Sequence, residues 1–290
     1  MSRPDDPFIA WLDAGARPDV ADVGGKGASL ARLAGLGFRV PPGFAVTTAA
    51  FRAQVAAVGP GAIGTATLNP DVAEALARGI DELARELAGA GFEPRFAVRS
   101  SAIAEDGAAA SYAGLHETEL DVAPDGIDGA VRRCWASLWS PVAAAYRARR
   151  EIDPADAAMA VVVQALVPAD ASAVVFTRHP VTGRQDQLVL TSTRGLGDAM
   201  VSGTITPDTT VVDKATGRVL EFDAGEDSSG AGSGGGPALA PGVLAELVAV
   251  SLEVEARFGL PVDIEAAHAG GCWYLLQARP ITTGAGVGAA

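Results

Sequence analysis

The sequence predicts an α+β fold, because helical and strand patterns occupy different parts of the chain. Segments 71–89 and 127–150 repeat apolar residues every three or four positions, which is the spacing of an amphipathic helix. After Asp153-Pro154 the pattern changes to short apolar runs bounded by turn residues, as expected for β-strands. A chain of 290 residues is long enough for one large domain or for two lobes.

Composition and charge exclude some classes of protein. Hydrophobic residues make up 49% of the chain and charged residues 20%, as in folded proteins, and the formal net charge is −13. An acidic chain lacks the basic surface that nucleic acids and anionic membranes attract, so we expect neither partner. No apolar run could span a bilayer and no signal-peptide core is present. We therefore expect a cytoplasmic protein, with Cys134 and Cys272 as reduced, buried thiols.

The first distinctive stretch is the run 23–27, Val-Gly-Gly-Lys-Gly, which leads into a helical pattern. Amide groups at a helix N-terminus can receive a phosphate, and Lys26 adds a positive charge. A helix-entry turn with a solvated lysine is an equally good interpretation. The run is not a P-loop, because that motif requires Ser or Thr directly after the lysine, where Gly27 stands.

A second distinctive stretch begins as a strand at Phe96. This strand is expected to end at Arg99, before Ser100-Ser101 and a long polar loop that leads to a strand ending at Val122. A guanidinium at a strand end, beside two hydroxyls and a loop, can hold an anion. A surface hairpin is the alternative, although long loops tend to be functional.

The remaining elements follow from local patterns. Thr47-Thr48 is expected to cap a helix that begins near Ala49, and a later helix spans about 243–258. Gln164 lies inside an apolar strand, so it is either a satisfied core amide or a ligand contact. The Gly/Ser-rich stretch 224–241 is expected to be a flexible insertion. Short apolar runs predict strands at 159–167, 171–176, 187–193, 209–213 and 219–222.

Residues 261–280 predict two strands joined by a turn at Gly270-Gly271. Because side chains alternate across a strand, Asp263 and Glu265 share a face of the first strand, and Gln277 and Arg279 share a face of the second. Pairing can bring all four onto one surface. Two carboxylates beside a cation suit a Mg²⁺–polyphosphate. A surface hairpin with solvated charges is an equal alternative.

Several short motifs follow one another in the order in which a known family carries them. They are Gly24-Gly25-Lys26, Val40-Pro41-Pro42-Gly43-Phe44, Val98-Arg99-Ser100-Ser101-Ala102, Tyr112-Ala113-Gly114, Arg133-Cys134-Trp135, Pro180-Val181-Thr182-Gly183, Gly195-Leu196-Gly197, Thr206-Pro207-Asp208, Asp263-Ile264-Glu265 and Leu276-Gln277-Ala278-Arg279-Pro280. Together they resemble the N-terminal ATP-binding domain of the dikinases, which include phosphoenolpyruvate synthase, pyruvate phosphate dikinase and rifampin phosphotransferase. The resemblance implies an ATP-grasp-like fold, in which two lobes clamp ATP. The lobes are expected at 1–155 and 156–283, with a tail at 284–290.

The resemblance also implies roles for single residues. Lys26 and Arg99 would hold the triphosphate, Gly114 and Thr118 would belong to a covering loop, and Gln164 would lie at the nucleotide. Asp263, Glu265 and Gln277 would coordinate Mg²⁺ or lie beside it, and Arg279 would bind phosphate. The expected catalytic residues are accordingly Arg99, Glu265 and Arg279, and the expected cofactors are ATP and Mg²⁺.

The sequence departs from the family pattern in its second half. Thr191 stands where the family carries Glu, Ala266 where an aromatic residue is common, and His179 where Asn or Asp is typical. Full-length members pass phosphoryl to a histidine in a Gly-Gly…Ser/Thr-His-Ala context. Neither His179, His116 nor His268 has that context.

Three functions are compatible with these observations. The first is a Mg-ATP-binding phosphotransferase component that delivers phosphoryl from ATP to a histidine domain on a separate polypeptide. The second is a stand-alone ATP-dependent small-molecule kinase, and the third is a catalytically weakened ATP-binding regulatory module. AMP as the product would indicate dikinase chemistry, and ADP an ordinary kinase.

Overall fold

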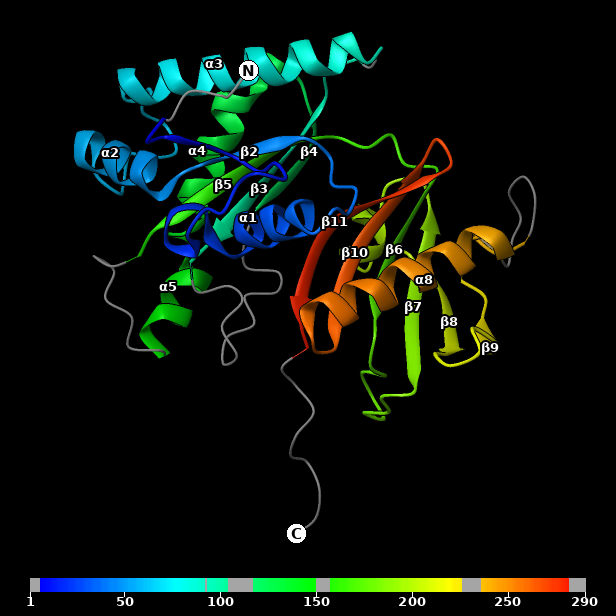
Figure 1. The fold of residues 1–290 in the computed structure, drawn as a ribbon. Coiled ribbons are helices and arrows are strands. Elements are labelled where there is room, and N and C mark those ends of the chain that lie inside the picture. The colour runs from blue at the N-terminus through cyan, green and yellow to red at the C-terminus, as the bar shows by residue number, and fades with distance from the viewer. Residues whose placement is uncertain (1–5, 92, 104–116, 150–156, 226–235, 282–290) are drawn as a thin grey trace. The chain divides into compact units, whose positions relative to one another are not determined.

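The fold is given by a computed structural model that describes residues 6–91, 93–103, 117–149, 157–225 and 236–281 (Figure 1). The chain divides into two compact units, one of Met1–Gly37 with Pro41–Leu166 and one of Phe38–Val40 with Val167–Ala290. Each unit combines helices with one antiparallel sheet, which confirms the α+β prediction. The division falls after Leu166 rather than after residue 155, because strand β5 (Met159–Ala165) pairs with strands of the first unit.

The first unit is built on a five-stranded sheet in the order β1-β2-β5-β3-β4. Besides β5, its strands are β1 (Ile9–Trp11), β2 (Gly43–Val46), β3 (Phe96–Ala102) and β4 (Thr118–Val122). Its helices are α1 (Val20–Gly35), α2 (Thr48–Val58), α3 (Pro70–Gly89), α4 (Ile127–Ser137) and α5 (Pro141–Arg149), with a short 3-10 helix, Pro124–Gly126, before α4.

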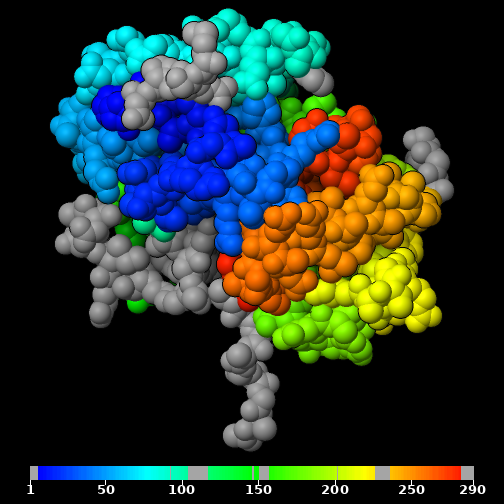
Figure 2. All heavy atoms as spheres, in the orientation of Figure 1, coloured from blue at the N-terminus to red at the C-terminus, as the bar shows by residue number. Residues whose placement is uncertain are grey.

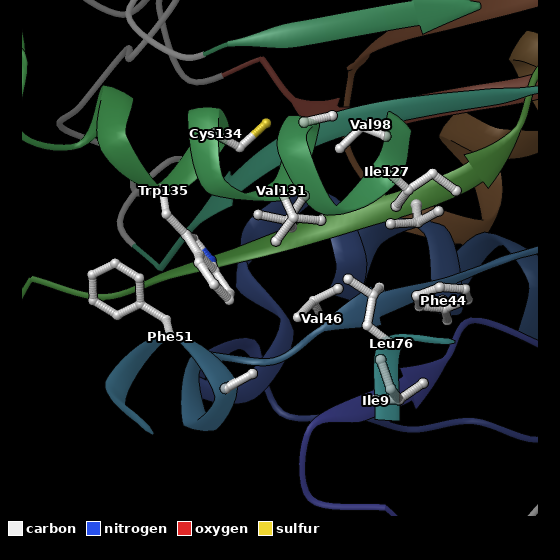
Figure 3. Close-up of a cluster of buried hydrophobic side chains, with 14 of the residues drawn as sticks. Ile9, Phe44, Val46, Phe51, Leu76, Val98, Ile127, Val131, Cys134 and Trp135 are labelled. Atoms are coloured by element: carbon white, nitrogen blue, oxygen red, sulfur yellow. The ribbon is translucent and has the colours of Figure 1, made fainter. Parts of the chain in front are cut away.

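One face of this sheet and helices α2, α3 and α4 enclose the hydrophobic core of the first unit (Figure 3). Trp135 of α4 is fully buried there, and its indole Nε1 donates a hydrogen bond to the carbonyl of Met159 at 3.1 Å. Helix α1 packs against β3 and β5 on the opposite face of the sheet. Its contacts are with side chains that point away from the core, such as Ala45 and Ser101, because successive side chains of a strand point to opposite faces. The core residues include Phe44, Val46, Phe51, Leu76, Val98, Ile127, Val131 and Cys134.

Two local predictions for this unit have different outcomes. The hydroxyl of Thr47 accepts a hydrogen bond from the backbone N–H of Ala50 and caps α2, as predicted. The single helix expected over 127–150 is wrong, because the chain forms two helices, α4 and α5. Pro141 explains the break: a proline has no N–H for a helical hydrogen bond, and it is tolerated as the first residue of α5.

The second unit is built on a six-stranded sheet in the order β11-β10-β6-β7-β8-β9. Helix α8 (Pro241–Phe258) packs against β10 and presents a surface to solvent, drawn in orange in Figure 2. No helix in the described ranges is long and apolar enough to cross a membrane. The other elements are β6 (Ala171–Phe176), β7 (Gln187–Arg194), α6 (Asp198–Val201), β8 (Asp208–Asp213), β9 (Val219–Asp223), β10 (Val262–Ala269) and β11 (Cys272–Pro280).

The Gly/Ser-rich insertion predicted at 224–241 is held at both ends by one side chain. Asp208 accepts a hydrogen bond from Gly225 N through Oδ1 and one from Ala238 N through Oδ2, each at 2.7 Å. Asp208 is almost fully buried, so these two N–H groups supply the polar partners that its carboxylate requires. Residues 226–235, between the two anchors, lie outside the described part of the chain.

Candidate nucleotide-binding site

The glycine-rich run 23–27 lies inside α1, at a kink at Gly24 where two helical segments meet. A helical segment begins within the run as predicted, although α1 as a whole starts earlier, at Val20. Gly24 has a left-handed φ of 69°, and a Cβ atom there would lie 2.1 Å from the carbonyl oxygen of Ser101 on β3. Both the backbone conformation and the close approach therefore require glycine. The Ser101 hydroxyl donates to the carbonyl of Val23 at 2.7 Å and accepts from the N–H of Gly27 at 3.2 Å. The Ser101 hydroxyl thus replaces the helical hydrogen bond that would join Gly27 N–H to the Val23 carbonyl, and it links the kink to β3.

Lys26 directly follows this kink and is only 8% exposed. The solvated-lysine interpretation is therefore wrong. A buried ammonium interacts more strongly with a nearby anion than an exposed one does, because less water screens its charge. A phosphate contact by Lys26 fits this position and stays a prediction.

Arg99 lies in the middle of β3, because the strand continues to Ala102 instead of ending at Arg99 as predicted. The two serines do not belong to a loop: both continue the pairing with β5, and they point to opposite faces. Ser101 and the half-buried Arg99 share the face that α1 covers. Ser100 points into the core, where its buried hydroxyl has no hydrogen-bond partner among the described residues.

Two further predicted contacts lie on the same face as Arg99. Thr118 is the first residue of β4 and stands opposite Arg99, so the two side chains are neighbours across the strands. Gln164 of β5 is buried, and its Nε2 donates to the carbonyl of Pro41 at 3.0 Å. The Nε2 of its amide thus has a backbone partner, and a nucleotide contact by Gln164 stays a prediction. Gly114 lies outside the described residues.

In the second unit, β10 and β11 form the predicted hairpin. Asp263 stands opposite Arg279, and Glu265 stands opposite Gln277. Residues directly opposite each other on antiparallel strands point to the same face, so these four polar side chains share one surface. This confirms the arrangement that side-chain alternation predicted for residues 261–280. Ile264, between the two carboxylates, points to the other face and is fully buried.

A β-bulge marks the end of this group of four side chains. The register shifts between Glu265 and Ala266, where Leu276 of β11 has no residue opposite it in the ladder. A bulge bends its strand and turns the adjacent side chains, and bulges occur often next to functional sites. Gln277, the neighbour of the bulged residue, is 6% exposed. Sequence alternation alone could not locate this irregularity.

Asp263 and Arg279 form an ion pair. Nε and Nη2 of Arg279 each lie 2.8 Å from the same oxygen, Oδ2 of Asp263. The side chain of Asp263 is 10% exposed, and that of Arg279 is 36% exposed. Burial raises the pKa of the Asp263 carboxyl, with a small addition from the charge of Glu265, although the charge and hydrogen bond of Arg279 act in the lowering direction.

The donor atoms on this face suit a hard divalent cation. Glu265 and Gln277 place a carboxylate and an amide side by side, and Asp263 supplies a second carboxylate. Mg²⁺ prefers oxygen ligands and is commonly held by one or two carboxylates together with substrate phosphates. Within the described ranges no cluster of three His, Cys, Asp or Glu side chains could hold a metal ion. The residues therefore fit a cation that the phosphates help to bind, rather than an all-protein metal cage.

Two departures from the family pattern have a structural meaning. Glu265 pairs with Val174, and Val174 pairs with Thr191, so Thr191 lies on the face that carries the group of four. A Glu at that position would have added a third carboxylate there. In the loop after β6, Nδ1 of His179 accepts hydrogen bonds from the N–H groups of Val181 at 3.2 Å and Thr182 at 3.3 Å. An Asn or Asp side chain can accept the same kind of hydrogen bond in a turn, so His179 can take its structural place here.

Two features are typical of a nucleotide-binding domain. One is the buried lysine after a glycine kink, and the other is the sheet face that carries carboxylates, an amide and a guanidinium. Residues 60–287 match the family model described as pyruvate phosphate dikinase, AMP/ATP-binding domain. The chain belongs to this family.

Curated relatives agree with this assignment. A probable phosphoenolpyruvate synthase from Methanothermobacter thermautotrophicus is 34% identical over 95% of this chain and 46% of its own length. A rifampicin phosphotransferase from Streptomyces sviceus is 38% identical over 98% of this chain and 37% of its own length. The chain thus spans less than half the length of these relatives. A solved acetyl-coenzyme A synthetase 1 from Ca. Korarchaeum cryptofilum covers 70% of the chain with a TM-score of 0.40 and 12% identity, which is too remote a likeness to assign a fold.

Proposed function

We propose that the chain binds Mg-ATP and delivers a phosphoryl group to an acceptor histidine that lies outside these 290 residues, on a separate polypeptide. The observation that carries the proposal is the register of the C-terminal hairpin, which sets Asp263 opposite Arg279 and Glu265 opposite Gln277. Membership of the ATP-binding domain family supports it. A cation, two carboxylates and an amide on one rigid face are what a metal-polyphosphate substrate requires.

Cationic side chains would bind the phosphates of ATP. Lys26 and Arg99 would bind oxygens of the triphosphate, and Arg279 would bind a further phosphate oxygen. Glu265 and Gln277 would hold Mg²⁺, with Asp263 beside them. When bound, the cation would neutralise the charge that develops on the phosphate oxygens during transfer. The protein groups would orient the phosphates and exclude water from them.

The histidines that the structure describes support an acceptor elsewhere. His179 uses Nδ1 as the acceptor of two backbone N–H groups in its own loop. His268 packs edge-on against Trp273, with ring centroids 5.1 Å apart, and its side chain is 12% exposed. A phospho-carrier must reach the transferred group freely, and neither side chain is placed for that task. His116 lies outside the described residues.

Labelled ATP tests the proposal directly. The protein is incubated with α-labelled ATP and Mg²⁺, with and without a candidate histidine-domain protein encoded nearby, and nucleotide products are separated. We expect ATP consumption that depends on the second protein, with AMP as the product and the β- and γ-phosphates of ATP recovered on the acceptor histidine and as inorganic phosphate. Equal turnover with and without it would contradict transfer in trans. ADP formed together with a phosphorylated small molecule would indicate a stand-alone kinase.

A non-catalytic ATP-binding module is the second candidate, and one observation favours it. Thr191 occupies the position on the shared face at which the family carries a carboxylate. A weakened metal site would leave binding intact and slow the chemical step. Saturable binding of Mg-ATP by calorimetry, with neither hydrolysis nor exchange under any partner condition, would support this candidate.

A further inference from the structure

The hydroxyl of Ser101 holds the backbone on both sides of Lys26. It donates to the carbonyl of Val23 at 2.7 Å and accepts from the N–H of Gly27 at 3.2 Å. Lys26 lies between these two attachment points and directly precedes Gly27. Both hydrogen bonds end on one fully buried oxygen atom, so the backbone that carries Lys26 cannot shift along β3 without breaking at least one of them.

Two close approaches hold the same segment against the strand. A Cβ atom at Gly24 would lie 2.1 Å from the carbonyl oxygen of Ser101, and one at Gly27 would lie 2.8 Å from the Cβ of Val23. Neither position has room for a side chain, so the kink rests directly on β3. Packing and hydrogen bonding therefore define the same position for the backbone of Lys26.

Strand β3 also carries the second cation that would meet the triphosphate. Arg99 and Ser101 are two residues apart on β3 and share the face that α1 covers. Their Cα atoms are about 7 Å apart, as for alternate residues of any strand, and the pairing of β3 with β5 fixes both. Ser101 thus connects the backbone of Lys26 to that of Arg99 through one side chain.

Exact placement matters more for a buried lysine than for an exposed one. Lys26 is 8% exposed. A solvated lysine can follow a phosphate by changing its rotamers, whereas packed neighbours confine a buried one. A displacement of about 1 Å at a binding group is enough to cost a large factor in a site of this kind. A backbone shift at Lys26 would therefore act directly on its contact with a phosphate.

We propose that Ser101 is a positioning residue, which sets the spacing between Lys26 and Arg99 for the phosphates of ATP. The inference rests on the proposed Mg-ATP binding and on the phosphate contact by Lys26. Ser101 would act through Lys26, without a contact of its own to the nucleotide. A purely structural role makes a different prediction: loss of the hydroxyl would lower stability and leave the ATP affinity of the folded protein unchanged.

The test is a double-mutant cycle on the full 290-residue chain, with Ser101→Ala, Lys26→Met and the double variant. Calorimetry measures the affinity for ATP at saturating Mg²⁺, at a temperature at which circular dichroism shows every variant to be folded. Ser100→Ala is the first control, because it removes the neighbouring hydroxyl, which points into the core. Leu76→Ala is the second, because it destabilises the same unit by a cavity in that core.

A positioning role predicts that Ser101→Ala weakens ATP binding about ten-fold when Lys26 is present. In the Lys26→Met background the same substitution should change the affinity less than about two-fold, because the group that it positions is gone. Ser100→Ala and Leu76→Ala should bind ATP as the unaltered protein does. An additive cycle, or a loss in Leu76→Ala as large as in Ser101→Ala, overturns the inference.

Gly27→Ala disturbs the same segment and leaves the Ser101 hydroxyl in place. Its new Cβ would lie 2.8 Å from the Cβ of Val23, so the backbone beside Lys26 has to move. Should Ser101→Ala fail to fold, this variant takes its place in the cycle. Its loss of ATP affinity should likewise disappear in the Lys26→Met background, and an additive result again overturns the inference.

Two outcomes separate the inference from the function on which it rests. If the unaltered protein binds no ATP, both the proposed function and the positioning role of Ser101 are overturned. If the unaltered protein binds ATP and Lys26→Met binds it equally well, Mg-ATP binding stands without Lys26. In that case only the positioning role is overturned, because Ser101 would have no phosphate ligand to position.

Discussion

Two adjacent serines of β3 should differ sharply in their contribution to stability, although the sequence presents them as equivalent. Ser101 is fully buried, and its hydroxyl satisfies both the Val23 carbonyl at 2.7 Å and the Gly27 N–H at 3.2 Å. Ser101→Ala would leave two buried backbone groups without partners. At about 1–2 kcal/mol for each group, we expect a loss of about 2–4 kcal/mol in the free energy of unfolding.

Ser100→Ala is the matched control in the same strand. The Ser100 hydroxyl is buried and has no hydrogen-bond partner in the described part of the chain. Its removal should leave stability unchanged or raise it by up to about 1 kcal/mol, because an unsatisfied buried group is lost. Urea unfolding followed by tryptophan fluorescence, to which the buried Trp135 of the same unit contributes, measures both variants. Equal destabilisation by the two substitutions would refute the role assigned to Ser101.

Two other predictions concern the loop after β6 and the thiols. His179→Asn should keep the free energy of unfolding within about 0.5 kcal/mol of the unaltered protein, whereas His179→Ala should lower it by about 1 kcal/mol. Only Asn keeps an acceptor for the N–H groups of Val181 and Thr182. Thermal unfolding measures both variants, and equal losses would contradict the turn-capping role. Burial raises the pKa of the Cys134 thiol to about 12, so at pH 8 a thiol reagent should modify the half-buried Cys272 and leave Cys134 intact until the protein unfolds. Above pH 9 the folded state keeps the Cys134 proton, whereas the unfolded state releases it. The free energy of unfolding should therefore fall by about 1.4 kcal/mol per pH unit between pH 9 and 12. A free energy of unfolding that does not change with pH over this range would contradict the assignment.

The C-terminal hairpin shows how far a local pattern determines a site. Side-chain alternation placed Asp263 with Glu265, and Gln277 with Arg279, and the observed register brings the two pairs together on one face. The bulge at Leu276 was not predictable, because a bulge depends on how two strands pair rather than on either strand alone. The ion pair that joins Asp263 to Arg279 follows from the same pairing.

The first unit shows where local patterns fail. The hydrogen bonds of Ser101 join residues 74 and 78 positions apart in sequence, and no short-range pattern reports such a contact. Strand β5 follows the change to strand patterns after Asp153-Pro154, so the sequence predicts it as the first strand of the second lobe. Its pairing with β2 and β3 places it in the first unit instead. Cys272 was expected to be buried and is half-buried, since it lies at the start of β11, next to the turn. Long-range pairing decides each of these cases.

Binding of Mg-ATP to the hairpin variants tests the central claim most directly. Calorimetric titration compares the unaltered protein with Glu265→Ala and Arg279→Ala. Arg184→Ala serves as a control, because Arg184 is an exposed arginine of the same unit that pairs with Asp186 at the surface. We predict that both hairpin substitutions weaken Mg-ATP binding at least about thirty-fold while the fold, followed by circular dichroism, is retained. Arg184→Ala should bind as the unaltered protein does. Normal Mg-ATP binding by both Glu265→Ala and Arg279→Ala would contradict the assignment of this site.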